Sequence, residues 1–248
     1  MEAWLPEGRG SGPHPVVVSI HGGLWLETYG RDLMDSVCAD LAERGWLAWN
    51  LEYRRVGGRR SGGGWPATFA DVAAGIDALA DHADLADLGR VAVVGHSAGA
   101  PLALWAAARP GLPDGAPGAH PAVEIRAVVS LSGILDLAAA ARSRRSLVGP
   151  GVVRFLGGRP DEVAGRYQLA SPAARLPIGP GVRQLVVHGE NDGTVPPEQS
   201  VDYARQATEV GDPVELSIVP RAGHMDLLDP RSPGWTATAE WLDGFIRR

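Results

Sequence analysis

One serine in the chain has the surroundings of an enzyme nucleophile. Ser97 is the middle residue of the sequence Gly-His-Ser-Ala-Gly at positions 95–99, which follows the apolar run 91–94. The run predicts a buried strand, and the alanine-rich residues 101–108 predict a helix with proline in its first turn. A serine between strand and helix lies on a sharp, strained bend that presents its Oγ to solvent. Ser97 is therefore our candidate nucleophile for acyl transfer.

A serine hydroxyl needs a general base within hydrogen-bond reach, and histidine usually fills that role. The sequence contains seven histidines. Three are interpreted as surface residues in loops or at a helix end: His14, His82 and His120. Three others are interpreted as packing or loop-bracing residues: His21, His96 and His188. The seventh, His224, follows the last predicted strand at the carboxyl edge of the sheet, where ligands bind, and is the predicted base.

The carboxylate that orients the base should lie on the loop after the preceding strand. Residues 189–196 read Gly-Glu-Asn-Asp-Gly-Thr-Val-Pro and supply two acids. We assign the role to Asp192 and keep Glu190 as the alternative, because Glu190 lies closer to the strand and can instead cap a turn or stand on the surface. Ser97, Asp192 and His224 together form a predicted catalytic triad.

The elements that must position these residues alternate between strand and helix patterns. Strands are expected at 3–5, 16–20, 46–51, 91–94, 127–131, 185–187 and 214–219. Helices are expected at 31–44, 66–82, 101–108, 198–210 and 235–246. This alternation predicts one α/β domain over residues 1–248, with a doubly wound, mostly parallel sheet of about seven strands. The strand-free stretch 134–183 is expected to form a small helical cap over the site.

Composition and charge exclude several classes of function. The net charge of −6 argues against a nucleic-acid partner, and the absence of lysine excludes a lysine nucleophile. Cys38 is the single cysteine, so no cysteine metal cluster is expected, and we predict that neither a metal nor an organic cofactor is needed. No apolar run approaches 18 residues and no signal-peptide pattern is visible, so a cytoplasmic protein without a membrane partner is expected. The sequence leaves the oligomeric state open and is compatible with a homo-oligomer.

Four motifs together resemble the α/β-hydrolase fold. They are Gly-His-Ser-Ala-Gly at 95–99, His-Gly-Gly-Leu-Trp at 21–25, His-Gly-Glu-Asn-Asp-Gly-Thr-Val-Pro at 188–196 and Ala-Gly-His at 222–224. Each motif is weak alone, but the order of serine, aspartate and histidine is the one that α/β-hydrolases use. The resemblance runs over nearly the whole chain, from about residue 16 to 246, and is closest to the esterase, kynurenine-formamidase-like and prolyl-oligopeptidase-like branches.

The resemblance implies an oxyanion hole made of backbone N–H groups. Ala98, the residue after the nucleophile, supplies one donor, and the His-Gly-Gly loop supplies others that map to Gly23 and Leu24. The loop has two glycines where many lipases and esterases have three, so Leu24 narrows the hole. Trp25 is the next residue and is expected to bind substrate as a wall that admits only short acyl chains.

These features predict a serine hydrolase that acts on a small-molecule acyl substrate, and a carboxylesterase in the first place. The main alternative is an arylformamidase acting on N-formylkynurenine, suggested by His-Gly-Gly-x-Trp and the compact single domain. A small acyl-peptidase is a further alternative, although such enzymes normally carry a large accessory domain. A non-catalytic binding member of the fold is disfavoured, because a binding protein has no reason to keep all three triad groups.

Overall fold

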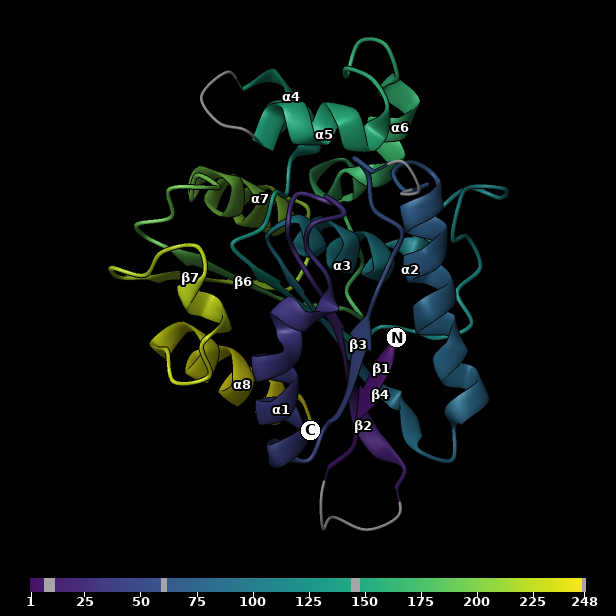
Figure 1. The fold of residues 1–248 in the computed structure, drawn as a ribbon, viewed down its shortest axis with the longest axis vertical. Coiled ribbons are helices and arrows are strands. Elements are labelled where there is room, and N and C mark those ends of the chain that lie inside the picture. Colours follow the sequence, from purple (N-terminus) through teal and green to yellow (C-terminus); the bar gives the residue numbers. More distant parts are fainter. Residues whose placement is uncertain (7–11, 59–61, 144–147, 247–248) are drawn as a thin grey trace.

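A seven-stranded sheet forms the centre of the fold (Figure 1). The computed structural model describes residues 1–6, 12–58, 62–143 and 148–246. The strands are β1 (Glu2–Trp4), β2 (His14–Ile20), β3 (Leu47–Leu51), β4 (Ala86–His96), β5 (Ala127–Leu131), β6 (Arg183–Gly189) and β7 (Val214–Val219). Their order in the sheet is β1-β3-β2-β4-β5-β6-β7, and all neighbours are parallel except β1 and β3. The predicted mostly parallel sheet of seven strands is confirmed.

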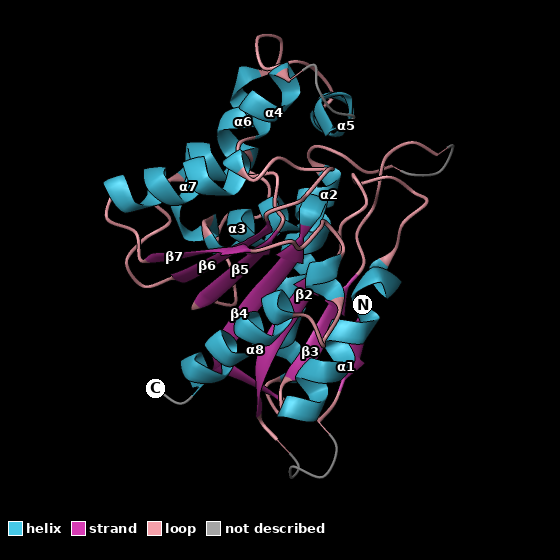
Figure 2. Ribbon diagram, turned by 90° about the vertical axis from the view of Figure 1, so that its left-hand side faces the viewer, coloured by secondary structure: helices cyan, strands magenta, loops and turns pink. Residues whose placement is uncertain are grey.

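Helices cover both faces of the sheet (Figure 2). The α-helices are α1 (Asp35–Arg44), α2 (Ala67–Asp77), α3 (Ala100–Ala107), α4 (Leu137–Arg142), α5 (Val148–Leu156), α6 (Ala164–Ala170), α7 (Glu198–Glu209) and α8 (Pro233–Ile246). The 3₁₀ turns are η1 (Arg31–Met34), η2 (Ala78–His82), η3 (Ser97–Gly99), η4 (Arg109–Gly111), η5 (Pro172–Arg175) and η6 (Asp226–Leu228). Helices α1 and α8 pack on one face, and α2, α3 and α7 pack on the other.

The central strands are apolar in their middle portions, where both of their sides are covered. In β2, Val16 and Val18 point into the core under α2 and α3, while Val17 points into the core under α1 and α8. All three are fully buried. This arrangement explains why the strands read as continuous apolar runs instead of alternating patterns.

The edge strand β1 runs antiparallel to β3, which the prediction of a parallel sheet did not specify. A parallel neighbour requires a crossover of a dozen or more residues, usually a helix. The stretch from Trp4 to His14 is too short to hold such a crossover, so β1 runs opposite to β2 and to its neighbour β3.

Three short helices, α4, α5 and α6, lie between β5 and β6 in the sequence and sit beyond the carboxyl ends of the strands (Figure 1). They fall within the stretch 134–183 expected to form a cap, of which residues 144–147 lie outside the described residues. Phe155 of α5 contacts Phe69 of α2, with ring centroids 5.3 Å apart. The cap is therefore continuous with the core under α2 and α3. In the described part of the chain, no helix combines the length and apolar character that crossing a membrane requires.

Substitution of Gly99 by alanine tests how tightly α3 packs on β2. A Cβ at this position would lie 2.1 Å from the carbonyl oxygen of Ile20 and 2.5 Å from that of His21. We expect Gly99→Ala to lower the free energy of unfolding, measured in urea, by about 1–3 kcal/mol, because the backbone must move to admit the methyl group.

The matched control is Gly165→Ala in α6, where an added Cβ meets no atom within 4 Å. Because alanine is the better helix former, this variant should be neutral or more stable by up to about 1 kcal/mol. Equal unfolding midpoints for the two variants would contradict the described packing.

Candidate active site

Ser97 occupies the predicted bend between β4 and α3. Its φ of 54° lies in the left-handed region, which a non-glycine residue adopts only under constraint from its surroundings. The constraint comes from close backbone packing, since a Cβ on Gly95 would lie 2.4 Å from the carbonyl oxygen of Gly99. The glycines on either side of Ser97 therefore allow the turn to close.

Ser97, His224 and Asp192 form a hydrogen-bonded chain at the carboxyl edge of the sheet. The Nε2 atom of His224, on the loop after β7, lies 2.9 Å from Ser97 Oγ. The Nδ1 atom of His224 lies 2.7 Å from Oδ2 of Asp192, on the loop after β6. Because the carboxylate only accepts, Nδ1 carries the proton and Nε2 is left to accept the hydroxyl proton of Ser97. The arrangement can thus activate the serine.

Asp192 is held as a carboxylate by its surroundings. Its Oδ1 atom accepts hydrogen bonds from the N–H groups of Thr194 at 2.8 Å and Val195 at 2.9 Å. Burial raises the pKa of Asp192, but hydrogen bonds from His188, His224 and the backbone together hold this pKa well below its usual range. The side chain therefore stays ionised throughout the neutral range and keeps the Nδ1 proton on His224.

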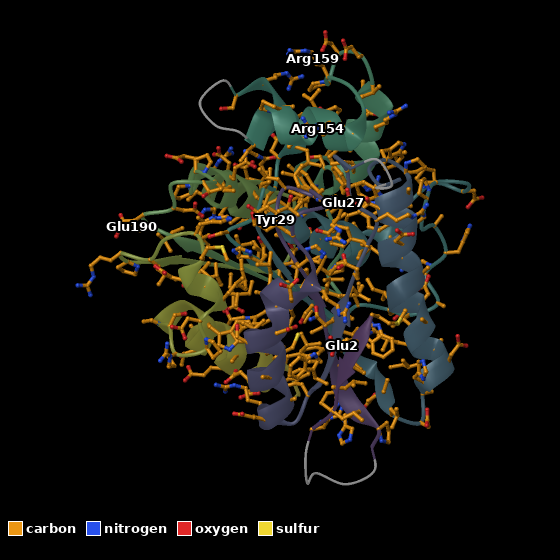
Figure 3. All side chains as sticks on the ribbon, viewed as in Figure 1. Glu2, Glu27, Tyr29, Arg154, Arg159 and Glu190 are labelled. Carbon is orange, nitrogen blue, oxygen red and sulfur yellow. The ribbon has the colours of Figure 1, made fainter. Side chains whose placement is uncertain are left out.

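Glu190, the alternative acid, bonds to the backbone of the loop after β7 and not to the side chain of His224. It is exposed, lies at the outer rim of the molecule (Figure 3), and accepts a hydrogen bond from the backbone N–H of Arg221 at 3.0 Å. The structure thus brings Asp192, and not Glu190, against His224.

Two further histidines contact the triad residues, which the sequence interpretation missed. The Nε2 of buried His96 donates to the main-chain oxygen of His224 at 3.0 Å, and the two rings lie 4.8 Å apart. Burial, together with the nearby His224, lowers the pKa of His96 to about 4, so it is neutral at pH 7. His188 is also fully buried, and its Nε2 lies 3.2 Å from Oδ2 of Asp192. The sequence signal that could have identified these contacts is position: His96 directly precedes Ser97, and His188 lies four residues before Asp192.

The loop that carries the predicted oxyanion donors lies directly against the nucleophile. A Cβ on Gly22 would lie 2.9 Å from the Cβ of Ser97. Gly23 and Leu24 have left-handed backbones, with φ of 96° and 51°. Within the described residues, the backbone N–H groups of Gly23 and Leu24 donate to no backbone carbonyl. They lie on the loop that contacts Ser97 and, with the N–H of Ala98, remain the candidate oxyanion donors.

His21 braces this loop, as the sequence suggested. Its Nε2 lies 3.0 Å from Oε1 of Glu52, and the hydroxyl of Tyr53 donates to the main-chain oxygen of His21 at 2.8 Å. The rings of His21 and Tyr53 stack with centroids 4.3 Å apart. Burial raises the pKa of Glu52, but the contact with His21 outweighs this effect and lowers the pKa to about 2. Glu52 is thus a carboxylate at neutral pH.

The prediction that Trp25 binds substrate is wrong. Trp25 is fully buried, and its indole stacks on Phe155 of α5 with centroids 4.1 Å apart and planes inclined by 5°. The left-handed backbone of Trp25 (φ 57°) belongs to the turn that carries its ring into the core under the cap. Leu24 instead remains partly exposed and lies against α5, where a Cβ on Gly151 would be 3.4 Å from Leu24 Cδ2.

The sequence is similar to a known protein family and to named proteins. Residues 1–206 match the protein family described as BD-FAE. LipM of Mycobacterium tuberculosis, whose name describes a carboxylic ester hydrolase, is 28% identical over 235 residues, covering 92% of this chain and 53% of LipM. The esterase LipC of the same organism is 27% identical over 251 residues, covering 96% of this chain and 60% of LipC. The chain thus spans little more than half the length of these curated relatives.

Solved structures establish the fold. A truncated carbohydrate esterase from gut microbiota is similar with a TM-score of 0.81 and 21% identity, covering 99% of this chain and 90% of that chain. The native esterase Est2 of Thermogutta terrifontis gives a TM-score of 0.76 and 22% identity, covering 98% of this chain and 85% of that chain. With the observed strand order, these likenesses identify the α/β-hydrolase fold that the motifs predicted.

Substitution of Trp25 by alanine distinguishes a packing residue from a pocket wall. We expect Trp25→Ala to lower the free energy of unfolding in urea by about 3–5 kcal/mol, because it removes the stacked partner of Phe155 from a closed interior. Trp65→Ala, at a partly exposed tryptophan that packs edge-on against Phe69, is the comparison and should cost less. A loss below about 1 kcal/mol for Trp25→Ala would indicate that Trp25 is a wall of the substrate pocket and not a packing residue.

Proposed function

The chain belongs to the BD-FAE family, and on that premise we propose that it is a serine hydrolase that cleaves small carboxylic esters through an acyl-enzyme. The observation that carries the proposal is the continuous hydrogen-bonded chain from Ser97 through His224 to Asp192. A hydroxyl, an imidazole and a buried carboxylate in this geometry are the parts of a nucleophile that is activated by general-base catalysis.

In the proposed first half-reaction, Ser97 Oγ attacks the ester carbonyl carbon as its proton moves to His224 Nε2. The negative charge that develops on the carbonyl oxygen is stabilised by the N–H groups of Gly23, Leu24 and Ala98. The imidazolium is stabilised by Asp192, which remains ionised. His224 then gives its proton to the departing alcohol oxygen, and the acyl group stays on Ser97.

In the second half-reaction, water takes the place of the alcohol. His224 accepts a proton from the water as it attacks the acyl carbon, and the same N–H groups hold the second oxyanion. The proton returns to Ser97 Oγ when the carboxylic acid leaves. Every proton transfer in this sequence uses Nε2 of His224, so the steps call on no cofactor or metal ion.

The acyl side of the substrate is proposed to be short. Leu24 carries one of the proposed donor N–H groups, and its partly exposed side chain packs against α5. Its side chain would therefore lie beside the acyl chain of a bound ester. Each methylene that fits is worth about 0.8 kcal/mol, and this gain ends where the chain meets a wall. We therefore expect acetyl to butyryl esters to be the preferred substrates.

Esters are proposed over the formamide and peptide alternatives because one named relative is described as a carboxylic ester hydrolase and the other as an esterase. N-formylkynurenine would react through the same triad and belongs in the substrate panel as the competing candidate. A single domain, a cytoplasmic location and the lack of a nucleic-acid partner stay predictions of the sequence, which leaves the oligomeric state open.

The test is hydrolysis of p-nitrophenyl acetate by the wild type and by Ser97→Ala. Removing the nucleophile should lower kcat by on the order of 10⁴-fold, and the residual rate comes from the oxyanion donors and binding. Ser217→Ala on β7 serves as a control for serine loss outside the site and should keep the wild-type rate. Equal rates for wild type and Ser97→Ala would refute a serine mechanism and favour a non-catalytic member of the fold.

A further inference from the structure

The carboxylate of Asp192 lies between two imidazole rings. One oxygen, Oδ2, is 2.7 Å from Nδ1 of His224 and 3.2 Å from Nε2 of His188. His188 is on β6, and its other ring nitrogen, Nδ1, lies 2.6 Å from the hydroxyl of Ser200 on α7. Each side of Asp192 therefore carries an imidazole followed by a serine hydroxyl, with Ser97 on one side and Ser200 on the other.

The contacts of His188 determine which of its nitrogens carries a proton. Nε2 faces two groups that can only accept, the Asp192 carboxylate and the carbonyl oxygen of Val195 at 3.0 Å. Nε2 therefore carries hydrogen. The hydroxyl of Ser200 can donate to Nδ1, so a neutral imidazole satisfies every contact. His188 and Ser200 are both fully buried, so these contacts are shielded from solvent.

We propose that His188, held in place by Ser200, is a positioning residue that sets the proton affinity of His224 through the carboxylate of Asp192. The proposal rests on the proposed serine hydrolase function and deepens it. An N–H that donates to Oδ2 draws on the same negative charge that stabilises the His224 imidazolium. With His188 present, Asp192 attracts the Nδ1 proton of His224 less strongly, so His224 more readily returns a proton to the leaving group.

Among the groups around His224, Asp192 is the acid that hydrogen-bonds to the imidazole ring. The end of β4 contributes Ser97 and His96, which burial keeps neutral. On its own loop, the carboxylate of Asp226 accepts a hydrogen bond from the backbone N–H of Gly223. Within the described residues, the acid that His224 contacts is Asp192. A change in the hydrogen bonds of Asp192 is therefore transmitted to His224.

The first test is the pH dependence of kcat/KM for p-nitrophenyl acetate in His188→Leu. This change removes the N–H donor and puts an apolar side chain of similar size in its place. The imidazolium of His224 is then better stabilised, so its pKa rises and the base is protonated over a wider range. We expect the acid limb of the profile to move to higher pH by about 0.5 to 1 unit.

Two further variants separate this role from a merely structural one. His188→Gln retains an N–H donor near the position of Nε2 and should return the acid limb toward the wild-type value. Ser200→Ala leaves the imidazole in place but removes the hydroxyl partner of Nδ1, so the ring is held less firmly against Asp192, and it should give a smaller shift in the same direction. Thr238→Ala, which removes a buried hydroxyl that bonds to Gly234 in α8, is the control and should leave the limb unchanged.

A lower rate with an unmoved acid limb in both His188→Leu and Ser200→Ala would overturn the proposal, because it would mean that His188 only supports the loop. A shift to lower pH would overturn it as well. If His188→Leu does not fold, the comparison of Ser200→Ala with wild type decides, since that variant removes a single oxygen atom.

A second measurement keeps this inference distinct from the proposed function. In Ser97→Ala protein labelled with ¹⁵N-histidine, NMR titration gives the pKa of His224 without any substrate. Adding His188→Leu to this background should raise that pKa, and an unchanged value would refute the proposal. If no ester is hydrolysed but the pKa still rises, the proposed function fails while the coupling between His188 and His224 stands.

Discussion

The left-handed backbone of Ser97 is the constraint on which the rest of the site depends. The residue holds this conformation because the bend around it is packed against neighbouring backbone, with Gly99 against β2 and Gly22 against Ser97 itself. A side chain at either glycine would separate Ser97 from the loop that carries the proposed oxyanion donors. The same close packing therefore strains Ser97 and holds it against that loop, while the loops after β6 and β7 bring Asp192 and His224 to the same edge of the sheet.

Helix α5 of the cap packs against the loop that carries the proposed oxyanion donors Gly23 and Leu24. Trp25 stacks on Phe155 of α5, and its neighbour Leu24 lies against Gly151 of the same helix. A shift of α5 would therefore displace the loop that holds the donor N–H groups of Gly23 and Leu24. This link gives α5 two effects on the proposed reaction, because the helix limits the room for the acyl chain and also supports the oxyanion hole.

The residues whose positions follow from strand order were predictable from the sequence. His224 and Asp192 each follow a strand with a clear apolar pattern, and parallel strands bring their carboxyl ends to one edge. Trp25 was not predictable, because two consecutive left-handed non-glycine residues reverse the direction of its side chain and leave no sequence signal. His188 was correctly read as a packed residue, but periodicity cannot show that a packed imidazole contacts a catalytic carboxylate. The edge strand β1 was expected at 3–5 and lies at Glu2–Trp4, but its antiparallel direction was not predicted, because a three-residue strand carries little pattern.

The central claim is that Ser97 is a nucleophile activated by His224, and covalent labelling with a fluorophosphonate tests it most directly. Such a reagent reacts with an activated serine whatever the natural substrate is. Intact-mass measurement and peptide mapping should find one phosphonyl group per chain, attached to Ser97, and His224→Gln should be labelled at least about 10²-fold more slowly. Labelling at another serine, or equal labelling rates for wild type and His224→Gln, would contradict the account.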